Sequence, residues 1–98
     1  MLKLLKVSGS SLLPVYRDGD FVLVCKIPIL FDRLKPGDTV AFYHPEHGLL
    51  IKKVSAISSG GDQITVLGNH PLSVDSRSIG PVQREKLLGK VIAHIRKP

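Results

Sequence analysis

Short apolar runs separated by glycine- and proline-rich turns dominate this chain of 98 residues. Its 9 glycines and 7 prolines are spread between the apolar runs. Because both residue types interrupt regular structure and favour turns, this pattern predicts many short strands. The length suits one domain with a modest core but not two, so we expect residues 1–98 to form a single domain.

The apolar runs and the turns between them predict an all-β fold. A coiled sheet or a partly open β-barrel of short antiparallel strands fits this spacing best. Lys86–Ile95 could be a closing strand or a short helix, and Gly89 within an apolar β-branched run favours the strand. No internal repeat is apparent. The expected strands are Lys3–Ser8 as an edge strand, Phe21–Cys25 buried on both faces, Thr39–Tyr43, Leu49–Ile57, Gln63–Leu67 and Lys86–Ile95.

The composition argues against several classes of protein. The formal net charge is +6, but the basic residues are scattered and aromatic residues make up only 5%. We therefore expect no nucleic-acid partner, while attraction to an acidic partner or a membrane surface stays open. No segment approaches the ~20 continuous apolar residues of a membrane span. Cys25 is the single cysteine, cannot form an internal disulfide, and is predicted to be a small buried residue.

A candidate nucleophile lies in residues 9–14, which read Gly-Ser-Ser-Leu-Leu-Pro. A second turn, Arg17-Asp18-Gly19-Asp20, follows and leads into the apolar run that begins at Phe21. A loop that enters a buried strand can hold a serine rigidly and still expose it. Serines in such turns more commonly bond nearby backbone, so this stretch alone favours a structural interpretation.

A serine hydroxyl needs a neighbouring base before it becomes a good nucleophile. A lysine can serve as that base when burial lowers its pKa and leaves it neutral. Residues 49–54, Leu-Leu-Ile-Lys-Lys-Val, place Lys52 and Lys53 in a strand-like apolar run. Strand alternation puts Lys52 with Leu50 and Val54, and Lys53 with residues 51 and 55, so alternation alone does not choose between the two lysines.

The four histidines offer neither a triad nor a metal site. They are His44, His47, His70 and His94, and none lies beside an aspartate-containing motif of the kind that a triad needs. Their spacing does not match that of metal ligands, so we expect no metal or other cofactor.

Together these stretches resemble the catalytic boxes of the type I signal peptidase family. That pattern is Gly-x-Ser-Met-x-Pro, then Gly-Asp-x-Val, then Ile-Lys-Arg-Val, then Gly-Asp-Asn followed by Ser-x-Asp-Ser-Arg. Order and approximate spacing agree from about Val7 to Ile95, and the last box corresponds to residues 68–77. The short chain is most similar to the small soluble branch, which includes maturation proteases of nickel superoxide dismutase.

The resemblance assigns a role to each candidate residue. Counted back from Pro14, its Ser-x-x-Pro spacing selects Ser11 rather than Ser10 as the nucleophile. The first basic residue of the lysine box is the general base, which selects Lys52. It also implies that Ser73 hydrogen-bonds and orients the lysine amine. A salt bridge between Asp75 and Arg77 would brace the loop.

Three positions depart from the family pattern. Leu12 replaces the methionine, which is a tolerable apolar exchange. Some relatives add a hydroxyl to the oxyanion hole two positions before the nucleophile, but Gly9 stands there, and whether Ser8 or Ser10 replaces it stays open. The Gly-Asp-Asn box reads Leu67-Gly68-Asn69 and lacks its acidic residue.

The sequence therefore predicts a serine endopeptidase with a Ser11/Lys52 dyad that removes an N-terminal leader or signal peptide from a precursor protein. One alternative is a self-cleaving domain of the SOS-repressor type, and another is a non-enzymatic basic β-barrel that binds a partner. We expect a cytoplasmic protein, with a peripheral membrane protein or a catalytic domain without its anchor as alternatives. The expected partner is the precursor or its leader peptide.

Overall fold

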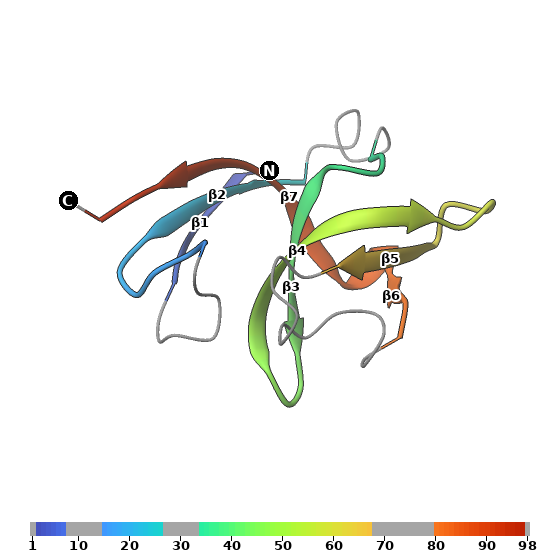
Figure 1. The fold of residues 1–98 in the computed structure, drawn as a ribbon, viewed down its shortest axis with the longest axis horizontal. Helices are drawn as coiled ribbons and strands as arrows, with labels where there is room; N and C mark the ends of the chain where they lie inside the picture. Colours follow the sequence, from blue (N-terminus) through green and yellow to red (C-terminus); the bar gives the residue numbers. More distant parts are fainter. Residues whose placement is uncertain (1, 8–14, 27–33, 68–79, 98) are drawn as a thin grey trace.

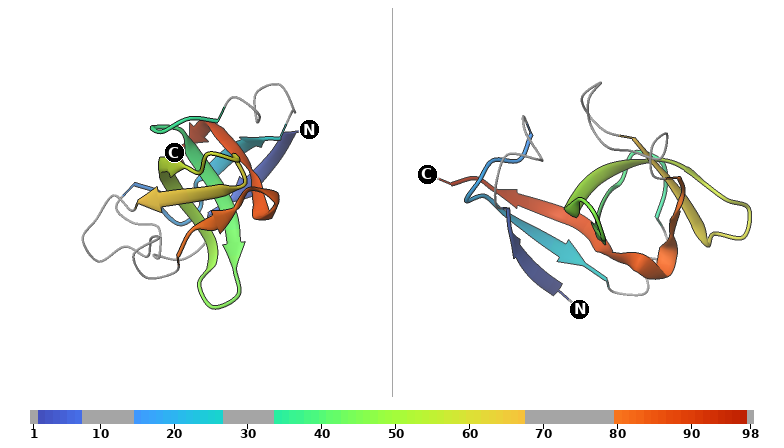
Figure 2. Two further views of the ribbon diagram at one scale, coloured as in Figure 1. Left: turned by 90° about the vertical axis from the view of Figure 1, so that its right-hand side faces the viewer. Right: turned by 90° about the horizontal axis from the view of Figure 1, so that it is seen from below.

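The computed structural model describes residues 2–7, 15–26, 34–67 and 80–97, and shows an all-β protein. Its seven strands form one antiparallel sheet in the order β1-β2-β7-β3-β4-β5-β6. The sheet curls into a half-barrel, as Figures 1 and 2 show. This confirms the predicted fold class. The strands are β1 (Leu2–Lys6), β2 (Phe21–Cys25), β3 (Thr39–His44), β4 (Gly48–Ile57), β5 (Gln63–Leu67), β6 (Val82–Gln83) and β7 (Leu87–Ile95).

Most strand predictions agree with the structure to within a residue or two at the described ends. β1 is an edge strand, and Ser8, where it was expected to end, lies outside the described residues. The segment predicted as strand or short helix forms strand β7 from Leu87 onward. The preceding residues, Arg84–Lys86, form a single 3₁₀ turn named η1.

Strand β7 lies between β2 and β3 and joins the two halves of the sheet (Figure 1). Lys90 pairs with Val40 of β3 on one side and with Cys25 of β2 on the other. Gly89 next to it has φ +151°, and a Cβ atom there would lie 2.5 Å from the carbonyl oxygen of Cys25. Only glycine fits at this junction, because the backbones of β7 and β2 approach too closely for a side chain.

The core is built from apolar side chains of β2 to β7, with Val7, Tyr16 and Leu34 added from outside the strands. The expectation that β2 is buried on both faces is wrong, because Phe21 and Leu23 are only partly buried. Their face of the sheet carries the paired residues Leu4 and Ile95, which are 56% and 51% exposed. The best buried residues include Val22, Val24, Val40, Val54, Ile64, Val66 and Leu87.

Candidate functional site

Lys52 lies in the middle of β4 and is buried, with an exposed fraction of 6%. It pairs with Val40 of β3, which is fully buried, and lies between Leu50 and Val54 on the same face of β4. Lys53, the neighbouring residue, is exposed. The structure therefore distinguishes the two lysines, which strand alternation alone did not. Lys52 is buried among apolar neighbours, whereas Lys53 is exposed.

The other residues assigned to the dyad and its support lie outside the described residues. These are Ser11, Ser73, Asp75 and Arg77, together with Ser8, Ser10 and the Gly68-Asn69 pair. The described ends of their segments are informative. Leu67, the last residue of β5 and the last described residue before position 68, pairs with Lys53 of β4, one register position from Lys52.

Val7, the last described residue before the segment that carries Ser11, is firmly hydrogen-bonded. The N–H of Val7 donates to the carbonyl of Asp20 at 2.7 Å, and the N–H of Gly19 donates to the carbonyl of Val7 at 2.8 Å. Val7 has no exposed surface. Val7 is therefore joined to the turn that leads directly into β2.

Asp20 is the most strongly perturbed acid among the described residues, and it is 3% exposed. Its carboxylate accepts hydrogen bonds from the backbone N–H groups of Lys97 (2.9 Å) and Arg17 (3.0 Å). It also lies 2.7 Å from Nε2 of His94. These three interactions, that of Lys97 first, lower the pKa of Asp20 from 3.8 to about 2 although burial opposes the shift.

A second buried aspartate, Asp38, occupies the corresponding place before β3. Its carboxylate accepts hydrogen bonds from the backbone N–H of Lys35 at 3.0 Å and from Nζ of Lys35 at 3.1 Å. Nζ of Lys90 lies 3.5 Å away. Burial acts to raise the pKa of Asp38, but the bonds from Lys35 and the charges of Lys90 and Lys35 outweigh it and lower the pKa.

The two aspartates belong to one short turn that occurs twice. Residues 17–22 and 35–40 both read basic-x-Gly-Asp-x-Val, and in each the aspartate accepts from the backbone N–H three residues earlier. Gly19 and Gly37 adopt φ +91° and +98°, a conformation that glycine tolerates best. This small repeat was not predicted from the sequence, although the Gly-Asp-x-Val pattern shared by both segments could have revealed it.

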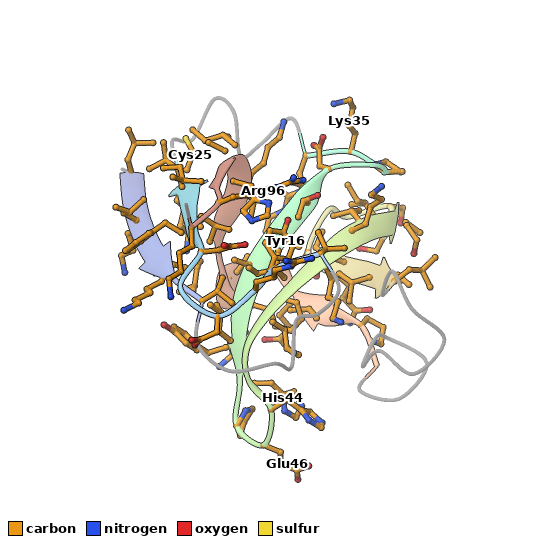
Figure 3. The ribbon with its side chains drawn as sticks, turned by 60° about the vertical axis from the view of Figure 1, so that its left-hand side comes forward. Tyr16, Cys25, Lys35, His44, Glu46 and Arg96 are labelled. Carbon is orange, nitrogen blue, oxygen red and sulfur yellow. The ribbon has the colours of Figure 1, made fainter. Side chains whose placement is uncertain are left out.

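The remaining candidates are placed clearly. Cys25 is buried and is a free thiol, as predicted. His44 and His47 contact each other at the tip of the β3–β4 hairpin, with ring centroids 4.7 Å apart, and the labelled His44 lies far from Tyr16 in Figure 3.

No three His, Cys, Asp or Glu side chains in the described part of the chain lie close enough together to hold a metal ion. Nor does this part contain a helix long and apolar enough to cross a membrane.

A half-barrel of antiparallel strands with a lysine buried in the middle of β4 suits a peptidase, and the chain matches a family described as signal peptidase, peptidase S26. The match covers residues 1–70, which include Ser11 and Lys52 but not the segment of Ser73, Asp75 and Arg77. The chain belongs to this family. No curated protein matches it significantly. Its place in the nickel superoxide dismutase branch stays a prediction.

Proposed function

We propose that this signal-peptidase-type protein is a serine endopeptidase in which Ser11 and Lys52 form the catalytic dyad. The observation that carries the proposal is the burial of Lys52 at 6% exposure within a chain of this family. A general base must be neutral at the working pH, and removal from water disfavours the charged form of a lysine. Lys53, exposed on the same strand, has no such environment.

The chemistry follows from these two groups. Lys52 takes the proton of the Ser11 hydroxyl as its oxygen attacks the scissile carbonyl, and the tetrahedral intermediate then expels the amine, which receives that proton from Lys52. A water molecule, activated by the same lysine, hydrolyses the acyl-enzyme and frees Ser11. The backbone N–H of Ser11 would contribute to the oxyanion hole. We assign Ser73 to orienting the lysine amine, and Asp75 with Arg77 to bracing their loop.

The substrate is proposed to be an extended leader or signal peptide of a precursor protein. Residues 48–52 of β4 pair with β3 on one side, whereas β5 pairs with β4 only from Lys53 onward in the described part of the sheet. We propose that such a peptide adds as a strand beside an exposed β edge near Lys52. This pairing would bring its backbone alongside the buried lysine.

A cleavage assay with matched control variants tests the proposal. The purified protein is incubated with a mixture of peptides that span the leader junctions of precursor proteins, and products are identified by mass spectrometry. We expect Ser11→Ala and Lys52→Arg to abolish cleavage, because arginine stays protonated in this pH range. The neighbouring substitution Lys53→Arg should retain it, because Lys53 is exposed on the same strand. Full activity in Lys52→Arg would contradict the proposal that Ser11 and Lys52 form a dyad.

The pH profile and the double variant provide a second test. Activity should rise with pH as Lys52 loses its proton, since only the neutral amine can act as base. The Ser11→Ala/Lys52→Arg double variant should be little worse than either single variant, because residues that act as a unit are not additive. If the activity of the double variant fell by the product of the two single losses, the shared role of Ser11 and Lys52 would be contradicted.

A further inference from the structure

Two stretches of the chain that are distant in sequence, residues 16–20 and 94–97, meet at the carboxylate of Asp20. Its Oδ2 accepts from the N–H of Arg17 and lies 2.7 Å from Nε2 of His94 on β7, and its Oδ1 accepts from the N–H of Lys97. The Tyr16 ring contacts the imidazole of His94, with centroids 4.6 Å apart. We call Tyr16, Asp20 and His94 the clamp. Figure 3 labels Tyr16 and, just beyond the end of β7, Arg96.

The clamp contacts the chain on both sides of residues 8–14, which include Ser11. Val7, the last described residue before it, exchanges backbone hydrogen bonds with Gly19 and Asp20. Tyr16, two residues after position 14, packs against the imidazole of His94. Thus one imidazole on β7, distant in sequence, is connected to the residues on both sides of positions 8–14.

We propose that His94 is a positioning residue for the Ser11 nucleophile, acting through Asp20 and Tyr16. This inference rests on the proposed function. His94 takes no part in the chemistry. Its role is to fix where the Ser11 segment leaves β1 and where it returns to the turn before β2. Small displacements of a reacting group are costly, since misplacement by about 1 Å can reduce the rate ~100-fold.

The charges around His94 favour a clamp that persists over a wide pH range. Asp20 and Tyr16 face the imidazole, while Arg17 and Lys97 approach the same carboxylate through their backbone N–H groups. Both the neutral Nε2–H tautomer and the protonated ring of His94 can donate to ionised Asp20. Protonation of Asp20 would weaken this bond by removing the negative charge of its acceptor, and replacing the imidazole by an apolar group would remove it.

The test compares His94→Leu with His94→Gln in the same cleavage assay. Leucine removes the donor, whereas the amide nitrogen of glutamine can take the place of Nε2. We expect His94→Leu to lower kcat at least tenfold while KM changes less than about twofold, because binding beside β4 does not involve the clamp. His94→Gln should recover most of kcat. Equal losses in both variants would overturn the role of the hydrogen bond.

Two controls separate positioning from loss of stability and from failure of the proposed function. Val82→Ala removes buried surface in β6 far from the clamp, and it should lower the unfolding midpoint without lowering kcat. Hydrogen exchange gives a readout independent of cleavage. The amides of Val7 and Gly19 should exchange faster in His94→Leu than in Val82→Ala, and unchanged exchange would overturn the inference.

The two hypotheses fail in different ways. Wild-type kcat in His94→Leu, together with inactive Ser11→Ala, would overturn the inference and leave the dyad in place. If Ser11→Ala cleaves as well as the wild-type protein, both the dyad and the role of His94 are overturned.

Discussion

Replacing Gly89 by alanine should destabilise the protein more than any comparable glycine substitution, because two backbones meet there. The new Cβ would lie 2.5 Å from the carbonyl oxygen and 2.8 Å from the carbonyl carbon of Cys25, and 2.8 Å from Cγ1 of Val24. None of these atoms is the end of a flexible side chain, so β2 must move away from β7. The backbone of Gly89, at φ +151°, is also unfavourable for alanine.

The expected magnitude is a sum of these two effects. An unfavourable backbone conformation costs ~1–3 kcal/mol and an overpacked site a further ~1–3 kcal/mol, which gives about 2–6 kcal/mol. A domain of this size has a total stability of roughly 5–15 kcal/mol. Since 1 kcal/mol lowers Tm by ~4–8 °C in a small domain, the lower end already predicts a decrease of at least about 8 °C.

The assay is urea unfolding of Gly89→Ala beside Gly48→Ala. Gly48 also has a positive φ, +72°, but a Cβ there would meet no atom within 4 Å, so its substitution costs only the ~1–2 kcal/mol of the left-handed conformation. A thiol reagent provides a second readout, because opening of the β2–β7 pairing exposes Cys25. The reasoning would be refuted if Gly89→Ala lost no more stability than Gly48→Ala.

Three further predictions concern single side chains. The pKa of Asp20 is lowered to about 2, so its contribution to stability is fully present above about pH 4 and is lost as the pH falls through 2; urea unfolding from pH 6 to pH 2 should show this loss in wild type, and an equal loss in Asp20→Asn would contradict it. Burial raises the pKa of Tyr16 above 10.0, so an ultraviolet titration should contain a late step that Tyr16→Phe removes, and its survival in that variant would exclude the assignment. Ile64→Ala, at a fully buried position of β5, should cost ~2–5 kcal/mol by denaturant unfolding, whereas Ile92→Ala, at a position 45% exposed, should cost far less; similar losses would argue against the core as described.

The fold was predictable because local signals agree with the final sheet. Apolar β-rich runs marked β2, β3 and β5, and the turns at Pro36-Gly37 and 45–47 separate strands as their composition suggested. Burial was harder to predict. Leu50, Ile51 and Lys52 are all buried in β4 although successive strand residues point to opposite faces, so both faces of this strand are covered at its centre. Alternation carries no information at such a position.

The clamp could not be predicted, since its contacts join distant parts of the chain. Asp20 and His94 are 74 residues apart in sequence. No local pattern distinguishes His94 from the histidines of the β3–β4 hairpin, and β7 reveals the contact only once it pairs with β2. For the dyad, burial distinguishes Lys52 from its neighbour Lys53. The pairing of Ser11 with Lys52 stays a prediction.

The central place of β7 has a consequence for how the protein is made. The ribosome delivers β1 to β6 before β7, yet β2 and β3 each need β7 as a neighbour. Until that strand emerges, the nascent chain carries two sheet halves whose facing edges offer unpaired N–H and C=O groups. Pairing across such a long sequence separation is slow and exposes the chain to aggregation. A stop codon shortly before Leu87 would therefore release two incomplete half-sheets rather than a slightly shortened protein.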